Sequence, residues 1–298
     1  MNLTSYPRYH GHVIRPPSEA NSLILQVMYG CSHGNCTFCG SYLGKPFRVR
    51  PFDEVIEDVQ NLPEGYKRNI DRVFLADGDA LAIPKRRMLE LLELLKAELP
   101  SLERISAYAN AHSLLRLSQE DLADIRQHGL QLLYLGLESG DDATLAFIKK
   151  GVTVAQQIEG CHKATAAGFA LSVTAILGIG GEERTHEHAI GTGKALSAID
   201  PEYIGILSLM LESGTEMTEA VRSGLFVVPK PLDLLRELRE IIANIDVTHA
   251  VFRSNHASNY VALRGTLPED KAALLGGLDR LIEQGDQARL KPEGWRAL

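Results

Sequence analysis

The stretch "SLILQVMYGCSHGNCTFCG", residues 22–40, joins an apolar run to a short loop that holds three of the four cysteines of the chain. The apolar run has the composition of a buried strand. A segment with helical periodicity, "PFDEVIEDVQNL" at residues 51–62, comes after the loop. The stretch therefore predicts the first strand, loop and helix of an α/β fold.

Five more apolar stretches repeat this pattern, and a segment of helical periodicity follows each of them. Pro84 and Ser118 mark helix starts, and Gly129 and Gly168 mark helix ends. Successive strand–helix units imply parallel strands joined by right-handed crossovers. We therefore predict a partial (β/α)6 TIM-like barrel with a C-terminal extension, and a doubly wound open sheet is the alternative. The five stretches are residues 72–79, 104–110, 132–139, 169–181 and 203–214.

Length and composition are typical of a soluble globular protein. The chain has 298 residues, 45% of them hydrophobic, and no apolar run reaches the ~18 residues of a membrane span. The first residues lack the pattern of a secretory signal, so we expect a cytoplasmic protein. The formal net charge of −7 argues against nucleic-acid binding. The expected parts are an N-terminal extension (1–20), the barrel core (21–215) and a C-terminal extension that closes the barrel mouth (216–298).

The clustered cysteines, Cys31, Cys36 and Cys39, indicate a metal or redox centre rather than a disulfide framework. A structural zinc site generally takes four ligands, and His33 is the nearby candidate for the fourth. A 4Fe-4S cluster held by three thiolates keeps one iron open to another ligand. On the residues alone both metals remain open, and the ligand count favours the iron–sulfur cluster.

The cysteine loop resembles that of the radical SAM (S-adenosylmethionine) superfamily, in which an aromatic residue precedes the third cysteine. Here the spacing is C-x4-C-x2-C with Phe38 in that place, whereas the common spacing is C-x3-C-x2-C. The longer first gap indicates a distinct, unassigned subfamily whose core resembles Elp3- and MiaB-like radical SAM proteins. The resemblance covers residues 20–215 and implies one 4Fe-4S cluster with three cysteine ligands and a bound S-adenosylmethionine.

The resemblance also implies roles for the polar turns that follow the predicted strands. The Asp77-Gly78-Asp79 turn would bind the methionyl amino group, Glu138-Ser139 the ribose, and the glycine-rich stretch after the fifth strand the adenine. Ordinary turns with helix caps are the alternative for the first two. Ser172 and Thr174 share one face of the fifth strand by alternation. The cofactor-binding candidates are Phe38, Asp77, Gly78, Asp79, Glu138, Ser139, Ser172, Thr174, Gly178, Gly180 and Gly181.

The activity implied is reductive cleavage of S-adenosylmethionine to a 5′-deoxyadenosyl radical, which abstracts hydrogen from a substrate carbon. A non-enzymatic iron–sulfur or zinc-binding protein on a barrel scaffold is the alternative. Cys161 stands alone in a helical segment and is predicted to be a buried small hydrophobe, so we expect no second cluster. We expect a small or medium-sized metabolite as substrate, a reductant such as flavodoxin or ferredoxin, and no membrane partner.

Candidate substrate residues follow the third strand and recur in the tail. The polar stretch 251–270 predicts a loop over the barrel mouth in which an arginine holds a substrate anion, or a loop that packs the tail. Arg48 and Arg50 are candidates for an anion or an electron donor, or are ordinary surface charge. The catalytic candidates are Tyr108, Asn110, His112, Arg253, Asn255 and His256, and Ser258, Asn259 and Arg264 add polar groups to the tail.

Overall fold

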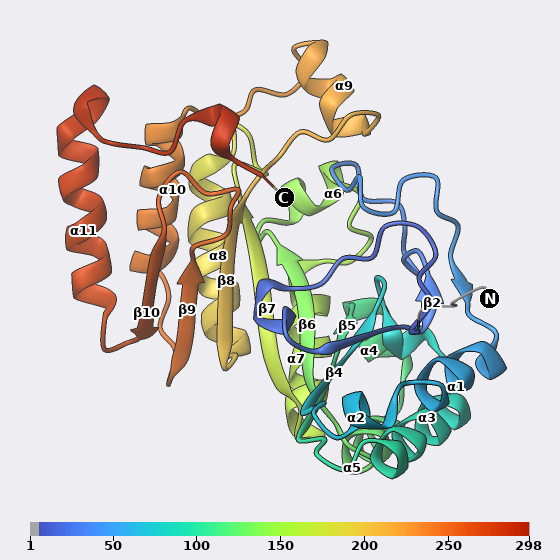
Figure 1. The fold of residues 1–298 in the computed structure, drawn as a ribbon. Helices are drawn as coiled ribbons and strands as arrows, with labels where there is room; N and C mark the ends of the chain where they lie inside the picture. Colours follow the sequence, from blue (N-terminus) through green and yellow to red (C-terminus); the bar gives the residue numbers. More distant parts are fainter. Residues whose placement is uncertain (1–5, 298) are drawn as a thin grey trace. The chain divides into compact units, whose positions relative to one another are not determined.

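The computed structural model describes residues 6–297, so the first five residues of the expected N-terminal extension lie outside the described residues (Figure 1). The chain divides into two compact units. The first comprises the residues up to Gly34, Ser41–Leu135 and Gly160–Ala170, and the second comprises Asn35–Gly40, Gly136–Glu159 and the residues from Leu171 onward. The cysteine loop therefore contributes Cys31 to the first unit and Cys36 and Cys39 to the second.

The main sheet has eight strands in the order β1-β4-β5-β6-β7-β8-β9-β10. Its recorded pairings are parallel except for the antiparallel pair of β9 and β10. The predicted α/β class with parallel strands is confirmed. The strands are β1 (Leu23–Gln26), β4 (Arg72–Ala76), β5 (Arg104–Ala109), β6 (Leu130–Glu138), β7 (Ala170–Leu177), β8 (Tyr203–Ser208), β9 (Ala250–Ser254) and β10 (Leu263–Leu267).

The helices begin and end at the residues that the sequence indicates. Pro84 and Ser118 precede helices, and the Ser118 side chain accepts a hydrogen bond from a backbone amide of the first turn. Gly129 and Gly168 have φ values of 112° and 90°, which glycine adopts readily where the chain leaves a helix. The helices are α1 (Phe52–Gln60), α2 (Glu64–Lys67), α3 (Lys85–Glu98), α4 (Ala111–Arg116), α5 (Gln119–Gln127), α6 (Asp142–Phe147), α7 (Val154–Ala166), α8 (Thr185–Ile199), α9 (Glu216–Arg222), α10 (Pro231–Ala243) and α11 (Lys271–Gln284).

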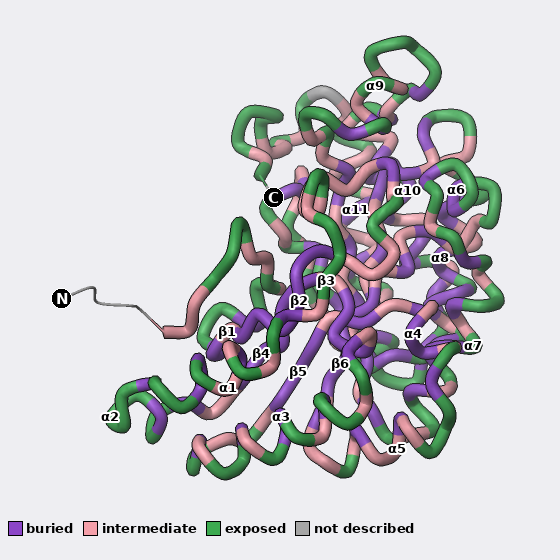
Figure 2. Tube along the Cα trace, turned by 90° about the vertical axis from the view of Figure 1, so that its right-hand side faces the viewer, coloured by how far each residue is buried: buried purple, intermediate pink, exposed green. Residues whose placement is uncertain are grey.

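Two strands of the first unit, β4 and β5, are largely buried (Figure 2). The early part of β6 belongs to the same unit, and its "LLYL" segment is buried throughout, as expected for a strand covered on both faces. An aromatic cluster of Phe74, Tyr108 and Tyr134 lies on these three strands with edge-to-face contacts. These strands therefore form a close-packed core from whose carboxyl ends the polar turns extend.

The first strand is shorter than predicted. β1 ends at Gln26, and Met28–Tyr29 forms β2, which pairs with β3 (Arg48–Val49) in a separate two-stranded antiparallel sheet. The carbonyl oxygen of Val27 accepts from the Arg50 amide at 3.2 Å, which keeps this second pairing in place. The expectation of one continuous strand was wrong because an apolar run does not show which sheet its residues join.

The tail is more regular than predicted. The stretch expected to be a loop contains β9 and β10, a strand pair that adds to the main sheet beyond β8. The polar side chains concealed the strand pattern, since Arg253 and Arg264 are exposed while Phe252 and Leu267 are buried. Closure of a barrel mouth by residues 216–298 stays a prediction.

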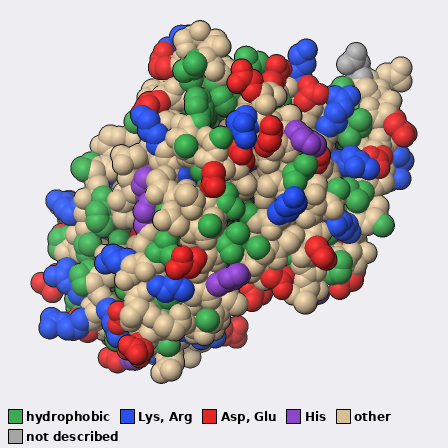
Figure 3. All heavy atoms as spheres, turned by 180° about the vertical axis from the view of Figure 1, so that it is seen from behind, with side chains coloured by type: hydrophobic (Ala, Val, Ile, Leu, Met, Phe, Trp, Pro, Cys, Tyr) green, Lys and Arg blue, Asp and Glu red, His purple; other side chains and the backbone are tan. Residues whose placement is uncertain are grey.

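On the face shown in Figure 3, acidic and basic side chains are interspersed. None of the helices within residues 6–297 combines the length and the apolar character that crossing a membrane requires.

Candidate functional site

The turn that follows β4 packs directly against the first cysteine of the loop. A Cβ added to Gly78 would lie 2.5 Å from the Cβ of Cys31 and 2.9 Å from its Sγ. The Gly78 amide donates to the carbonyl oxygen of Gly30 at 3.0 Å. Because any side chain at position 78 would displace the cysteine, glycine is required here. The structure thus brings together two residues that the sequence assigned to the cluster and to its cofactor.

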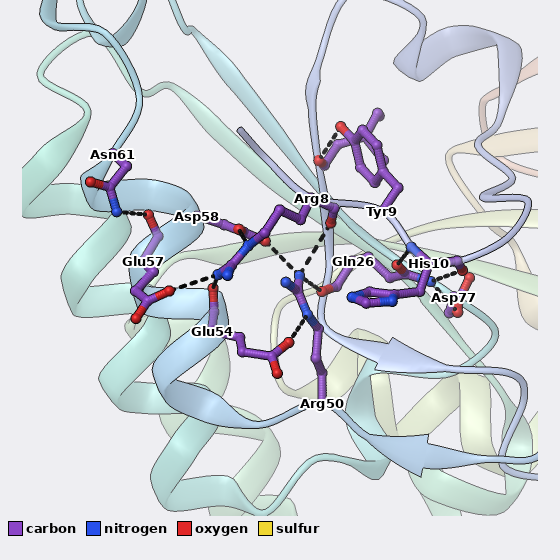
Figure 4. A network of polar contacts seen from close by, with 11 residues as sticks. Arg8, Tyr9, His10, Gln26, Arg50, Glu54, Glu57, Asp58, Asn61 and Asp77 are labelled. Atoms are coloured by element: carbon purple, nitrogen blue, oxygen red, sulfur yellow. Dashed lines mark hydrogen bonds and ion pairs between the residues drawn. The ribbon is translucent and has the colours of Figure 1, made fainter. Parts of the chain in front are cut away.

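Asp77 holds the start of the cysteine loop with one carboxylate oxygen. Its Oδ2 accepts from Gln26 Nε2 at 2.9 Å, from the Gly30 amide at 3.1 Å and from Lys45 Nζ at 2.6 Å. Figure 4 shows the Gln26 contact at the edge of a larger polar network. The other oxygen, Oδ1, is buried and has no hydrogen-bond partner among the described residues. With φ at 71°, Asp77 holds the left-handed conformation that clusters at functional turns.

Asp79 is also fully buried, and neutral hydroxyl groups hold it. Its Oδ2 accepts from Ser32 Oγ at 2.6 Å and from Ser113 Oγ at 2.5 Å, while Oδ1 has no hydrogen-bond partner in the described part of the chain. Burial raises the pKa of this carboxyl to about 6. Its side chain does not cap the short 3-10 helix that follows (Ala80–Ala82), so the alternative of an N-cap at this position was wrong.

The residues after β5 lie against the same loop. Asn110 accepts from the Ser113 amide at 3.0 Å as the N-cap of α4, and its Nδ2 donates to Ser32 Oγ at 2.9 Å. The ring of His112 stacks on His33, with centroids 4.7 Å apart and planes 18° apart. Both catalytic candidates therefore contact the segment that follows Cys31.

Tyr108, the third candidate of this region, lies in the aromatic cluster of the core. Its ring packs edge-on against Phe74 at 4.9 Å, and burial raises the pKa of its hydroxyl. The structure therefore gives Tyr108 a packing role and separates it from the polar contacts of Asn110 and His112.

The second half of the cysteine loop is fixed within the second unit. The Thr37 amide donates to the Ile148 carbonyl oxygen at 3.0 Å, and the Met217 amide donates to the Thr37 carbonyl oxygen at 2.9 Å. Phe38 packs against a buried apolar cluster that contains Ile148 and Met217. The Gly40 amide donates to a carboxylate oxygen of Glu212 at 2.7 Å. Cys36 and Cys39 are thus held on a loop that is anchored at both of its ends.

The turn after β6 begins with Glu138, which has φ at 62°. Its carboxylate forms an ion pair with Lys150 Nζ at 2.9 Å. Gly136 leaves room for this conformation, because a Cβ there would overlap the Glu138 carboxylate. Two of the predicted turns therefore have an acidic residue in the left-handed region where a strand ends, Asp77 directly after β4 and Glu138 as the last residue of β6.

Two residues that sequence analysis missed hold the remaining cofactor candidates of the second unit. His188 lies 2.8 Å from the hydroxyl of Ser139, and Glu237 accepts from the amide of Gly178 at 2.7 Å. Glu237 did leave a signal, because it shares the inward helical spacing of Leu234 and Ile241, where an apolar residue is expected. A charged side chain at such a position needs a buried partner.

The remaining cofactor candidates lie along β7 and after it. Ser172 and Thr174 are half-buried while their neighbours in β7 are buried, so the predicted alternation is confirmed. Gly180 lies close to the Cβ of His188, and Gly181 has φ at 66°. Cys161 is 3% exposed and burial raises the pKa of its thiol to about 12, which confirms the buried cysteine predicted from the sequence.

The polar side chains of the tail have two different environments. Asn259 accepts from Ser208 Oγ at 2.7 Å and donates to the Ile206 carbonyl oxygen at 2.7 Å, and the hydroxyl of Ser258 accepts from the Ser208 amide. His256 lies 2.9 Å from the Ser258 hydroxyl, and burial lowers its pKa. These three residues attach the tail to β8. The exposed side chains are Arg253, Asn255 and Arg264.

Arg50 is not a surface charge. It is 1% exposed, and its guanidinium contacts Asp58 Oδ2 at 2.5 Å and Glu54 Oε2 at 3.2 Å (Figure 4). The alternative of surface charge was wrong, because a local pattern does not show which side chains the N-terminal segment will cover. A role of Arg50 toward an anion or an electron donor stays a prediction. Arg48 is exposed and lies over the ring of Tyr29 at 4.8 Å.

The family model of the radical SAM superfamily matches residues 25–191, more than half of the chain. The protein belongs to the radical SAM superfamily. The matched segment includes the cysteine loop, the turns after β4 and β6 and the glycine-rich turn after β7. The match ends within α8, so α9, α10, α11 and the strands β8–β10 lie beyond it.

Curated relatives match the chain over parts of their length. An uncharacterised methyltransferase of Pyrococcus horikoshii is 28% identical over 66% of this chain and 41% of its own length. A tRNA-2-methylthio-N(6)-dimethylallyladenosine synthase of Pseudomonas fluorescens is 29% identical over 57% and 40%, and the heme chaperone HemW of Bacillus subtilis is 22% identical over 74% and 59%. The chain thus spans about half the length of these relatives.

Solved structures share the fold. Methylornithine synthase (PylB) superposes with a TM-score of 0.54 at 17% identity, over 76% of this chain and 63% of the other. Coproporphyrinogen III oxidase (HemN) of Escherichia coli gives 0.54 at 17% identity over 74% and 51%. The Elp3 of Methanocaldococcus infernus gives 0.52 at 13% identity over 81% and 60%. The chain thus has an α/β fold of mostly parallel strands that these structures share.

Proposed function

We propose that Cys31, Cys36 and Cys39 hold one 4Fe-4S cluster, and that the turns after β4, β6 and β7 bind S-adenosylmethionine. When bound, the cluster and its cofactor supply a 5′-deoxyadenosyl radical for hydrogen abstraction. Thiolates are the donors that iron–sulfur clusters take in proteins, and three of them leave an open iron. No group of three or more His, Cys, Asp or Glu side chains forms a metal site in the described residues, so this ligand set rests on the spacing of the loop.

The close packing of Gly78 on Cys31 is the observation that carries this proposal. It sets the turn expected to bind the methionyl amino group against the first cysteine of the cluster. A cofactor that contacts both an iron and this turn needs the two to be adjacent, and glycine leaves the backbone of the turn accessible.

The carboxylate oxygens of the turn are hydrogen-bond acceptors with negative charge, which suits a cationic amine. Asp77 and Asp79 each use one carboxylate oxygen to build the loop and keep the other buried without a hydrogen-bond partner among the described residues. A buried carboxylate oxygen without a partner is costly, and an ammonium group would satisfy it with a charge-assisted hydrogen bond. In this proposal the two carboxylates orient the amino group, and the backbone of Gly78 contributes its carbonyl oxygen.

We propose a small or medium-sized metabolite as the substrate, a flavodoxin or ferredoxin as the reductant and the cytoplasm as the location. The net charge of −7 and the interspersed surface charges favour a small substrate over a nucleic acid. The relative from Pseudomonas fluorescens is named as a tRNA-modifying synthase, and this chain spans 40% of it. Asn110 and His112 contact the loop after Cys31 and are the preferred catalytic candidates, whereas Arg253 and Asn255 are candidates to hold a substrate anion.

The test is cofactor cleavage by the anaerobically reconstituted and reduced protein. With S-adenosylmethionine added, the wild type should form 5′-deoxyadenosine, and Cys36→Ala should form none because one iron ligand is lost. Cys161→Ala is the matched control, since that thiol is buried within α7 and is not one of the three clustered cysteines. It should retain both iron and cleavage.

Cleavage at the wild-type rate in Cys36→Ala would contradict the assigned ligands. Retention of zinc instead of iron after reconstitution of the wild type would contradict the cluster itself.

A further inference from the structure

A chain of buried polar side chains connects the two turns of the second unit that the proposed function assigns to S-adenosylmethionine. It runs from Ser139, after β6, through His188 of α8 to Glu237 of α10, and from Glu237 to Gly178, after β7. Ser139 and His188 are 0% exposed and Glu237 is 2% exposed. Hydrogen bonds join Ser139 to His188 and Glu237 to Gly178, whereas the buried Nε2 of His188 has no hydrogen-bond partner among the described residues. Buried hydrogen bonds of this kind favour one arrangement of the groups that make them.

Glu237 fixes the turn after β7 at its first residue. Its Oε1 accepts from the Gly178 amide at 2.7 Å, and its Oε2 accepts from the hydroxyl of Thr185 at the start of α8. Gly178 has φ at 78°, which a residue with a side chain adopts only with strain. One carboxylate therefore holds both ends of the glycine-rich segment between β7 and α8.

His188 fixes the turn after β6. Its Nδ1 lies 2.8 Å from Ser139 Oγ, and its Nε2 points toward Glu237 Oε1 at 3.5 Å, too far for a hydrogen bond. One turn further along α8, Thr192 accepts from the Gly140 amide at 2.9 Å, and a Cβ on Gly140 would overlap the backbone of Gly191. This turn thus lies directly on one face of α8.

We propose that Glu237 and His188 are positioning residues for S-adenosylmethionine, and that α10 is a part of the cofactor site. The inference rests on the proposed function of the two turns. α10 packs on α8 and lies beyond residue 191, where the match to the superfamily ends. A ligand that binds to backbone turns gains affinity when other groups have already fixed their conformation, since less order is then lost on binding.

The test measures the dissociation constant for S-adenosylmethionine on the reconstituted protein, together with the melting temperature. Glu237→Ala removes the acceptor of the Gly178 amide and should raise the dissociation constant about tenfold. Glu237→Gln keeps a carbonyl oxygen for that amide and should stay within about threefold of the wild type. A merely structural role would lower the melting temperature and leave the dissociation constant of the folded protein unchanged.

Glu240→Ala is the matched control on the same helix, because its carboxylate pairs with the exposed His186 at 2.9 Å. Its dissociation constant should equal that of the wild type. Should Glu237→Ala fail to fold, Thr185→Val removes only the hydroxyl bound to Glu237 Oε2 and should raise the constant about threefold.

Unchanged affinity in Glu237→Ala, or in Thr185→Val where that variant replaces it, would overturn the inference while cofactor binding by the wild type stands. A reconstituted wild type that does not bind S-adenosylmethionine would overturn the proposed function and this inference with it.

Discussion

Two buried carboxylates of the first unit, those of Asp58 and Asp79, are held in opposite ways. Asp58 of α1 is surrounded by charge, since it contacts Arg50 at 2.5 Å and Arg8 at 2.6 Å (Figure 4). Asp79 accepts from neutral donors, the hydroxyls of Ser32 and Ser113, and its second oxygen has no hydrogen-bond partner in the described chain. Both side chains are 0% exposed.

The charge of the neighbouring groups distinguishes the two sites: the network around Asp58 is structural, whereas the one around Asp79 is suited to binding a cation. Two arginines neutralise Asp58, and their contacts tie the N-terminal segment to α1 and β1. Hydroxyl groups orient Asp79 without supplying positive charge, and the carboxylate therefore remains available to a cation. The comparison predicts that loss of Asp58 mainly affects stability and that loss of Asp79 mainly affects the response to pH and to the cofactor.

The largest expected effect is on folding. Asp58→Asn leaves the buried guanidinium of Arg50 without its closest counter-charge and should lower the free energy of unfolding by about 3 to 5 kcal/mol. Urea denaturation followed by circular dichroism measures this change. Glu57→Gln is the control, because the exposed carboxylate of Glu57 pairs with Arg8 at 3.1 Å, and it should change stability by less than about 0.5 kcal/mol. Similar losses in the two variants would show that Asp58 is not the centre of the network.

An effect of intermediate size is expected from Asp79 on the pH dependence of the free energy of unfolding. Burial raises its pKa from 3.8 to about 6, so the folded protein binds this proton more tightly than the unfolded chain. The stability from this site is therefore complete below about pH 4 and falls by about 3 kcal/mol as the pH rises through about 6. Asparagine does not titrate, so this loss should be absent in Asp79→Asn. The unfolding free energy of the wild type minus that of Asp79→Asn should therefore fall by about 3 kcal/mol between pH 4 and pH 7. Parallel pH profiles would contradict a buried carboxylate held only by hydroxyls.

The smallest expected effect is that of replacing Asn110, which caps a helix and also contacts the cysteine loop. Asn110 and Ser118 both cap helices, and replacing either with alanine should cost about 1 kcal/mol of unfolding free energy. Only Asn110 also donates to Ser32, next to Cys31. Iron content after reconstitution should fall in Asn110→Ala and should not change in Ser118→Ala. Equal iron content in both variants would leave Asn110 as a cap alone.

Much of the fold could be predicted from local pattern. The alternation of apolar and helical segments located six strands of the main sheet, and glycine and proline located helix ends, because both signals depend on neighbours in sequence. The tail strands were missed because their outward side chains, such as Arg253, are polar and the inward ones are few. The burial of Arg50 was missed because its partners Arg8 and Asp58 lie in other segments.

The α/β class, the three-cysteine loop with its radical SAM resemblance, and the polar turns at the ends of the strands could all be inferred from local sequence. How these turns are held became evident from the folded chain: Gly78 packs on Cys31, Asp79 is oriented by hydroxyls, and Glu237 supports Gly178 from a position 59 residues later. Residue types show which chemistry a turn can offer. Which buried donors and acceptors meet depends on contacts between distant segments, which no local pattern encodes.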